Sequence, residues 1–459
     1  MLLRPDWRKD AADVETIGAV VSQAIDTAEG SGDSHNARHE HMFNPWLTCS
    51  HLMVKVLGDN IIGHWTYVGT PRLRRMREKD KQNRDAIARA VFANLAYAVA
   101  LGIEPPEVGV SLRAAKQKIT RYDRRGFGNL PGVIDLLASY GGSILLLRRS
   151  DRKGISSAIS TNEDWAADLR KTKIGVHHFG QEPGRETIYL GRVERDFAGR
   201  EESRELIDYA DTDETHRYRA EMEAINAFLA SSDISLQDHE GKPSPTGLPF
   251  LRRHFNLQPD DPEGTERFDL GGRLFGGWWQ TLPKDQRHRI RIKGEPVADL
   301  DFNAMFVRLA YLRGGLTPPA GDLYAGLPGL PGEPWRAGVK KAVLAMLFRR
   351  TPLTRVPRGT SGELPPGTSG PQLRAAILAA HPALAPVFET GIGLSLMFTE
   401  SQVIVKALLD LADQKVPALP MHDGLMVARS KADKVARIMS YAAEAVTGHR
   451  LPISLKSLY

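Results

Sequence analysis

The segment that decides the fold is VADLDFNAMFVRLAYL, Val297 to Leu312. Its first half alternates like a strand and places Asp299 and Asp301 on the same side. Its second half has apolar residues at helical spacing. An acidic strand end that runs directly into a buried helix can hold a divalent cation beside a core sheet, because such ions prefer oxygen ligands.

A second segment, ALPMHDGLMVAR from Ala418 to Arg429, predicts a hairpin. Two apolar runs flank His-Asp-Gly, which is a turn signal. We expect Asp423, at that turn, to meet the first carboxylate across adjacent strands. Phosphoryl transfer by two magnesium ions needs such a pair, because the carboxylates bridge the ions that hold the attacking and leaving oxygens.

Between these segments, PWRAGVKKAVLAMLFRR predicts a helix that begins near Pro334. Arg336, Lys340, Leu344 and Phe348 recur every fourth residue, so they share one face of that helix. Taken singly, the two cations fit a solvated face and the two hydrophobic residues fit ordinary core. Together they form a stripe that suits a triphosphate at one end and a base at the other.

The three segments resemble motifs A, B and C of family A (polymerase I type) DNA polymerases and of single-subunit phage RNA polymerases. Motif A is DFNAMFVR, in which Arg308 follows seven residues after Asp301, and this spacing selects Asp301 over Asp299 as the metal ligand. Motif B is the four-residue stripe, and motif C is MHDG. Further segments follow the family's order: Gly272-Arg273-Leu274 with Trp279-Gln280-Thr281-Leu282-Pro283, then Asp322-Leu323-Tyr324, and Glu400-Ser401-Gln402 at an expected helix start.

The resemblance spans about residues 271–435 and implies an α+β right-hand polymerase with an antiparallel palm sheet and helical fingers. It implies two Mg²⁺ ions on Asp301 and Asp423, with Lys340 as the acid for the leaving pyrophosphate. The nucleotide would contact Arg336, Lys340, Leu344, Phe348 and Phe306. The primer–template would contact Arg273, Gln280, Gln402, His422 and Arg308.

The chain also departs from the family pattern. Family A usually has Glu five residues after the motif A Asp, where it helps to exclude a 2′-hydroxyl, but this chain has Phe306. A bulky Phe306 would itself act as a steric gate and favour deoxynucleotides. The motif B aromatic is Phe348 followed by Arg349 in place of Tyr followed by Gly, and Gly424 replaces the usual Glu after the motif C Asp.

The N-terminal half predicts a DNA-binding module. Residues 81–175 are expected to form a winged-helix-like domain, with helices over 85–101, 111–122 and 129–139, strands over 143–147 and 155–160 around a basic turn, and a helix from Thr161. A small α+β linker domain is the alternative. Residues 1–80 are expected to be a partly disordered extension, 176–245 a helical, thumb-like connector and 246–459 the palm and fingers.

Two N-terminal features leave alternatives open. The dense cations Arg72, Arg74, Arg75, Arg77, Lys79, Lys81 and Arg84 fit either phosphate contact or a solvated helix face. In the Gly-, Ser- and His-rich segment 29–41, a mobile loop is the ordinary interpretation, and metal binding is the alternative for His35, His39 and His41.

Composition sets the remaining limits. The 459 residues are 42% hydrophobic and 25% charged, which is typical of a globular chain with two or three domains. A net charge of +6 is compatible with a polyanionic partner. The single Cys49 excludes an intrachain disulfide framework, and the N-terminus lacks the apolar core of a signal peptide, so a cytoplasmic protein without membrane contact is expected.

The function expected from the sequence is DNA-dependent DNA synthesis in plasmid or phage-like replication, without a proofreading exonuclease. The expected partners are a DNA primer–template, nucleoside triphosphates and replication proteins. One alternative is a single-subunit polymerase or primase that makes RNA. The other is a DNA-binding replication initiator with an inactive palm.

Overall fold

The computed structural model describes residues 41–68, 76–112, 119–140, 144–151, 155–195, 201–244, 246–258, 260–262, 264–330, 334–360 and 362–459. Over these residues the chain is α+β with mostly antiparallel sheets, as the sequence predicts. None of the helices described is long and apolar enough to cross a membrane.

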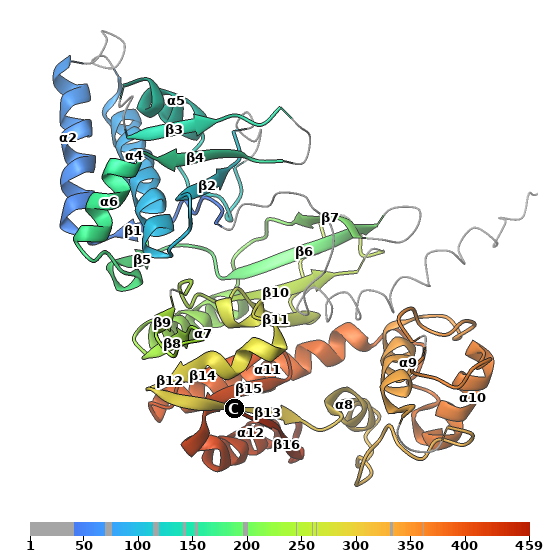
Figure 1. Cartoon of the computed structure of the whole chain (residues 1–459). Coiled ribbons are helices and arrows are strands. Elements are labelled where there is room, and N and C mark those ends of the chain that lie inside the picture. The colour runs from blue at the N-terminus through green and yellow to red at the C-terminus, as the bar shows by residue number, and fades with distance from the viewer. Residues whose placement is uncertain are drawn as a thin grey trace, which may run out of the picture. The chain divides into compact units, whose positions relative to one another are not determined.

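The chain folds as two compact units (Figure 1). The N-terminal unit contains the described part of 32–186 together with 235–248, and the C-terminal unit contains 187–234 and 249–459. The division at residues 186/187 therefore lies beyond the boundary expected at 175. Most of the expected connector, including its helix, belongs to the C-terminal unit.

A long helix, α4 (Glu78–Ala100), forms the centre of the N-terminal unit. From Ile87 onward it is buried on nearly all sides, as expected of a helix that is apolar all round. It contacts α2 (Leu52–Val68), α5 (Leu130–Tyr140) and α6 (Glu163–Lys171). The helices expected over 85–101 and 129–139 are therefore present.

A three-stranded antiparallel sheet completes this part of the unit, in the order β2 (Glu107–Val110), β4 (Ser157–Thr161), β3 (Leu145–Arg148). The expected hairpin is β3 and β4, and β2 is an addition that was too short for periodicity to reveal. Thr161 ends β4, and Asn162 caps α6 by accepting a hydrogen bond from the Trp165 N–H. Half of the helix expected over 111–122, residues 113–118, lies outside the described residues, and 111–112 and 119–122 are not helical.

Smaller elements surround these: β1 (Leu47–Cys49) pairs with β5 (Phe179–Gln181), which follows the 3₁₀ turn η1 (Val176–His178). A short hairpin pairs β8 (Ile234–Gln237) with β9 (Pro243–Ser244).

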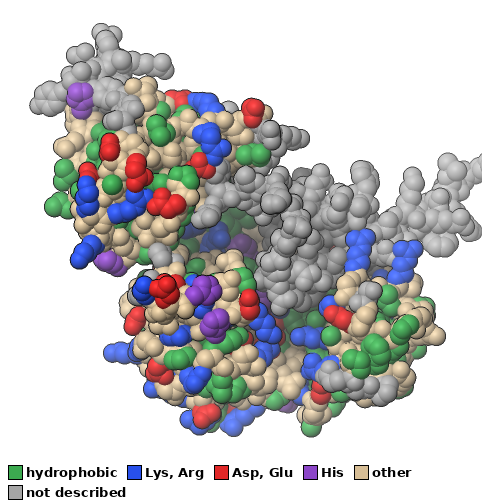
Figure 2. Space-filling view, in the orientation of Figure 1, with side chains coloured by type: hydrophobic (Ala, Val, Ile, Leu, Met, Phe, Trp, Pro, Cys, Tyr) green, Lys and Arg blue, Asp and Glu red, His purple; other side chains and the backbone are tan. Residues whose placement is uncertain are grey.

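The basic stretch is not one uninterrupted solvated face. Arg72, Arg74 and Arg75 lie outside the described residues, but Arg84 is buried and pairs with Asp85 at 2.6 Å. Figure 2 shows basic and acidic side chains interspersed on the visible face of this unit. Of the three histidines considered for metal binding, only His41 is described, and its ring lies 3.2 Å from the side-chain oxygen of Asn94.

The C-terminal unit begins with a four-stranded sheet and a helix. The sheet order is β11 (Gly271–Phe275), β10 (Arg252–Leu257), β6 (Ile188–Arg195), β7 (Glu201–Leu206), and only the β10–β6 pair is parallel. The helix α7 (Asp213–Ala230) starts at the predicted cap, Thr212, whose side chain accepts a hydrogen bond from the Thr215 N–H.

A second sheet carries the two acidic segments. Its central strand, β13 (Glu295–Phe302), pairs with β15 (Gly424–Ala428) on one edge and with β16 (Ile453–Leu458) on the other. β14 (Ala418–Met421) continues beyond β15, and β12 (Ile290–Ile292) forms a hairpin with the start of β13. The 3₁₀ turns η2 (Trp278–Gln280) and η3 (Lys284–Arg289) lead into this sheet.

Helices surround this second sheet. α8 (Met305–Arg313) follows β13 directly, as predicted, and α9 (Arg336–Phe348) is the predicted cationic helix. α9 packs beside α10 (Gly370–Ala380), which precedes the turn η4 (Pro382–Leu384). Figure 1 shows α9 and α10 together at one end of this unit.

The helix α11 (Gly393–Asp413) lies at the centre of the unit and contacts α7, α8, α9 and β11. It also contacts α12 (Ala432–Thr447), which follows the turn η5 (Arg429–Lys431). Glu400 lies well inside α11, although the sequence placed it at a helix start. The segment 355–370, expected to be disorder-prone, forms turns in its described part, with Leu364 buried.

One buried amide joins α7 to the strand β10. The Asn226 side chain donates to the Leu251 carbonyl at 2.9 Å and accepts from the Leu251 N–H at 2.7 Å. We expect Asn226→Ala to lower the free energy of unfolding by roughly 2–4 kcal/mol, because it leaves two buried backbone groups without partners. Denaturant unfolding would measure this loss. The control is Glu223→Ala, an exposed change on the same helix, and equal stability of the two variants would contradict the role of Asn226.

Candidate active site

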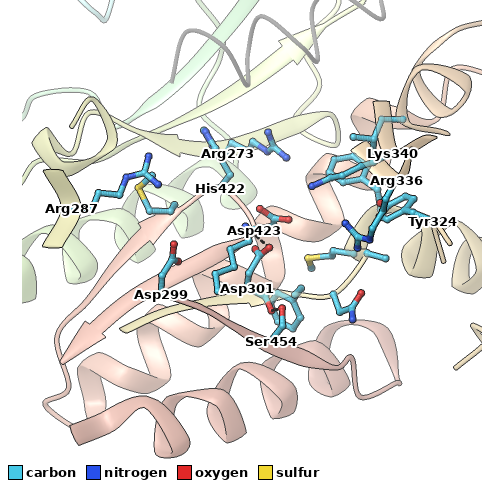
Figure 3. A pocket seen from close by; sticks show the side chains of 18 residues that line it. Arg273, Arg287, Asp299, Asp301, Tyr324, Arg336, Lys340, His422, Asp423 and Ser454 are labelled. Carbon is cyan, nitrogen blue, oxygen red and sulfur yellow. Dashed lines mark hydrogen bonds and ion pairs between the residues drawn. The ribbon is translucent and has the colours of Figure 1, made fainter. Parts of the chain in front are cut away.

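The predicted site residues converge on one cavity of about 480 Å³ in the C-terminal unit (Figure 3). β13 supplies Asp301 and Asp299, the β14–β15 turn supplies Asp423, and α9 supplies the cations of its stripe. The cavity is lined by these predicted residues: Asp301, Asp423, Arg336, Lys340, Leu344, Phe306, Arg273 and His422. Residues far apart in the sequence, two of them acidic and several basic, therefore face the same space.

Strand register brings the two carboxylates together. Asp301 pairs with Gly424, the residue directly after Asp423, and the Phe302 N–H lies 3.4 Å from the Asp423 carbonyl. Glycine is required at this crossing, because a Cβ on Gly424 would lie 2.5 Å from the Leu300 carbonyl oxygen and 3.1 Å from Asp301 Oδ1. A Glu cannot occupy position 424 on this backbone.

Two residues at the cavity have left-handed backbone conformations that are rare outside glycine. His422 has a φ of 55° in the turn before Asp423, and Ala304 has a φ of 50° between β13 and α8. Such conformations cost of order 1–3 kcal/mol and persist only where the surroundings impose them. Ala304 lies just after β13, which carries Asp301, and His422 lies between β14 and Asp423, so both fix the path of the backbone next to a carboxylate.

The carboxylates interact strongly. Burial raises the pKa of Asp301 to about 8, and repulsion by Asp423 adds to the effect. Burial also acts to raise the pKa of Asp423, but Lys456, Arg273 and Lys340 together hold it below its ordinary value. Burial and mutual repulsion thus oppose a second negative charge on this pair, and a nearby cation is needed for both carboxylates to be ionised together.

The environment of His422 leaves its ring neutral. Burial and the nearby Arg273 lower the pKa of His422 to about 4. Neither ring nitrogen has a hydrogen-bond partner among the described residues, and both are buried. The ring lies edge-on to Phe275, with centroids 6.2 Å apart.

Lys456 is the site residue that the sequence interpretation missed. Its Nζ lies 2.5 Å from Asp301 Oδ2, and the other Asp301 oxygen is buried without a partner. Tyr324, Arg287 and Ser454 also line the cavity. No motif marks Lys456, since it is one cation in the short alternating run ISLKSL, and only the pairing of β16 with β13 brings it to Asp301.

The cations of α9 differ in their bonding. Arg336 makes a bidentate ion pair with Asp322, at 2.5 and 3.2 Å, and its guanidinium lies 5.4 Å from the centre of the Tyr324 ring. Lys340, one turn later, is exposed and has no hydrogen bond or ion pair to any described residue. Asp322 therefore orients Arg336, while Lys340 can engage a ligand without breaking an existing contact.

A buried ion pair between β11 and α11 holds Arg273, another residue of the cavity lining. Arg273 donates to both oxygens of Glu400, at 2.7 and 3.1 Å, and its guanidinium lies 5.6 Å from the Phe306 ring. Burial raises the pKa of Glu400 to about 7, although Arg273 opposes that rise. Arg273 thus ties α11 to β11 and also presents positive charge to the cavity.

Other predicted residues lie outside the cavity lining. Arg308 is buried and donates to the carbonyls of Asn303, Pro319 and Gly321, all within 2.9 Å. Phe348 is buried behind the cavity, against Phe306 with ring centroids 5.6 Å apart. These contacts give Arg308 and Phe348 structural tasks, and direct contact with a substrate remains a prediction for both.

The two predicted duplex-contacting glutamines are also engaged within the protein. The Gln280 amide donates to the carbonyls of Leu274 and Pro420 and accepts from the N–H groups of Gly276 and Gly277. Gln402, half-buried on α11, lies 3.4 Å from the Tyr218 hydroxyl. Gln280 therefore anchors the strand before the motif C-like turn, and contact of either residue with a duplex is untested.

The carboxylates of the cavity are the candidate ligands for a divalent metal ion. Among the residues described, no three His, Cys, Asp or Glu side chains are grouped closely enough to hold a metal ion. Asp301 and Asp423 could supply two carboxylates, and the unpartnered Asp301 Oδ1 is the kind of atom that an ion would satisfy. The residues therefore fit Mg²⁺, which usually binds through one or two carboxylates and takes its other ligands from water and phosphate.

Comparisons with known proteins add no assignment. No known protein family matches the chain, and no curated protein matches it. The case for a function therefore depends on the geometry of this cavity.

The close approach at Gly424 gives a direct test of the site's packing. We expect Gly424→Ala to destabilise the protein by about 1–3 kcal/mol, because the added methyl must displace the backbone of β13. Denaturant unfolding measures the change. Gly63→Ala on α2, where an added Cβ meets nothing within 4 Å, is the control and is expected to be neutral or stabilising. A neutral Gly424→Ala would show that β13 and β15 are not this close.

Proposed function

We propose that the chain catalyses template-directed nucleotidyl transfer, with DNA as the most favoured product, through an active site of the family A polymerase type. The observation that carries the proposal is the meeting of Asp301 and Asp423 on adjacent strands, in the cavity on which Arg336 and Lys340 also open. Carboxylates paired with a cationic helix suit a triphosphate and its magnesium ions.

Each side chain has a specific task in this proposal. Lys340, exposed and unbonded, binds the triphosphate and supplies the proton for the leaving pyrophosphate. Arg336 adds a second phosphate contact when it exchanges Asp322 for the ligand. Leu344 and Phe306 form the apolar surface for the sugar and base. Two Mg²⁺ ions on the carboxylate pair would supply charge stabilisation at the attacking and leaving oxygens.

Phe306 supports DNA as the product. Its ring lines the cavity and is fixed between the Arg273 guanidinium and the Phe348 ring. A rigid aromatic ring beside the sugar excludes a 2′-hydroxyl by volume. This is the task that a Glu performs at the corresponding position of the family that the chain resembles.

The N-terminal unit supports a DNA partner less directly. Its β3–β4 hairpin carries Arg148 and Arg149 on an exposed surface, where they pair with Glu107 and Asp135. Exposed ion pairs are weak, so both arginines can exchange these partners for phosphates. We propose that this winged-helix-like hairpin contacts the DNA backbone.

The central test removes one carboxylate at a time. We expect Asp301→Asn and Asp423→Asn to reduce Mg²⁺-dependent extension of a primed DNA template by about a thousandfold or more, because each loses a ligand for the ions that stabilise transition-state charge. Primer extension measures the activity, and a gel shift checks that DNA binding is kept. Chelation of Mg²⁺ is expected to abolish extension by the unmodified chain.

Asp299→Asn is the matched control. Asp299 lies two residues before Asp301 on the same face of β13 and also lines the cavity. It has no place in the proposed metal site, so we expect less than a tenfold change in extension. Normal extension by both Asp301→Asn and Asp423→Asn would refute the proposed function.

The proposed steric gate makes a separate prediction. We expect Phe306→Ala to raise the incorporation of ribonucleotides relative to deoxynucleotides roughly ten- to a hundredfold, because it removes the ring that fills the space of a 2′-hydroxyl. Competition between the two nucleotide types in single-nucleotide extension measures the ratio. Leu344→Ala, which changes another apolar residue of the cavity lining, is expected to slow both nucleotide types alike. An unmodified chain that already prefers ribonucleotides would favour RNA synthesis instead.

A further inference from the structure

The carboxylate that is proposed to bind a metal ion already holds a cation from the chain itself. Lys456 Nζ lies 2.5 Å from Asp301 Oδ2, a charge-assisted contact at the short end of the usual range. The second Asp301 oxygen has no hydrogen-bond partner within the part of the chain that the structure describes. Lys456 and Asp301 come from neighbouring strands, β16 and β13, and both line the same cavity as Asp423.

A β-bulge places the lysine there. Leu455 pairs with Leu300 and Ser457 pairs with Asp299, so Lys456 is an extra residue without a partner on β13. A bulge of this kind changes the direction of a side chain and is common beside active sites. Here it directs the ammonium group to Asp301, on the cavity side of β13.

Packing does not trap the lysine in this position. About 48% of its side chain is exposed, whereas only 8% of the Asp301 side chain is. The lysine side chain can therefore turn toward water without being drawn out of a packed core, while the carboxylate cannot. When the lysine leaves, Asp301 and Asp423 need another cation to offset their mutual repulsion.

We propose that Lys456 is an intramolecular counter-ion that competes with a divalent metal ion for Asp301 and so sets the metal concentration at which the site fills. This inference rests on the proposed function. A lysine ammonium on Asp301 Oδ2 opposes a metal ion on the same carboxylate, even at the other oxygen, Oδ1, because two cations a few ångströms apart repel each other. The ammonium keeps the carboxylates balanced until metal and triphosphate arrive, and it then moves toward solvent.

The test is metal binding by the full chain without nucleic acid or nucleotide. Titration with Mn²⁺, followed by the loss of the free-ion signal in electron paramagnetic resonance, gives the dissociation constant. We expect Lys456→Met to bind Mn²⁺ roughly tenfold more tightly, because it removes a unit charge that contacts a ligand atom in a partly screened site. Lys456→Arg keeps the charge and is expected to bind much like the unmodified chain.

Two controls make the titration specific. Lys79→Met removes an exposed lysine of α4 in the other unit and is expected to leave Mn²⁺ binding unchanged. Asp301→Asn is expected to abolish the tight binding. Thermal unfolding checks that each variant folds, and Lys456→Gln replaces Lys456→Met if that variant does not.

The outcomes separate this inference from the proposed function. If Lys456→Met or Lys456→Gln binds Mn²⁺ no more tightly than the unmodified chain while Asp301→Asn loses binding, the metal site stands and the counter-ion role is wrong. If Asp301→Asn binds Mn²⁺ as the unmodified chain does, both the metal site and the inference are wrong. Tighter binding by the Lys456 variants together with loss in Asp301→Asn supports both.

Discussion

The pairing of β13 along both of its edges is the constraint on which the site depends. One edge brings the β14–β15 turn, and with it Asp423, beside Asp301, while the other edge brings Lys456. Asp301 lies more than a hundred residues before Asp423 and Lys456 in the chain, and the hydrogen bonds of β13 fix the spacing of all three charged groups. Because adjacent strands lie about 5 Å apart, the groups cannot drift without breaking backbone pairs.

Buried arginines of β10 and β11 hold the part of the cavity wall that lies on these strands. Arg273 is held by Glu400, and the fully buried Arg253 reaches the Gly272 carbonyl, the Ser401 hydroxyl and Glu221, each at 3.1 Å. These contacts join α11 and α7 to β10 and β11. Loss of one partner from such a pair leaves an uncompensated buried charge, which is strongly destabilising. The network therefore explains why α11, which carries no predicted catalytic group, is nevertheless central to the cavity.

The sequence predicted the elements that line the cavity and the meeting of Asp301 with Asp423, but it did not predict contacts that depend on the tertiary fold. The strand–helix at Asp301, the hairpin at Asp423 and the helix from Arg336 all have strong local signals in periodicity and turn residues, and all three are present. Lys456 could not be foreseen, because its position depends on the register of a distant strand and on a bulge. The same limit applies to Gln280, because its hydrogen bonds to backbone groups depend on the tertiary fold. It also applies to Arg84, whose place in a charged helical segment would suggest exposure to solvent but which is buried.

The discontinuous C-terminal unit has a practical consequence. Its chain runs over 187–234, leaves for the other unit and returns at 249, and β6 from the first piece pairs with β10 from the second. A fragment that starts at residue 246, the expected beginning of the palm, would remove α7 and the inner strand β6, exposing the edge of β10 and the buried Arg253. The unpaired backbone N–H and C=O groups along that strand edge would pair with other chains, and the shortened protein would aggregate. A minimal soluble version therefore has to start upstream of residue 187.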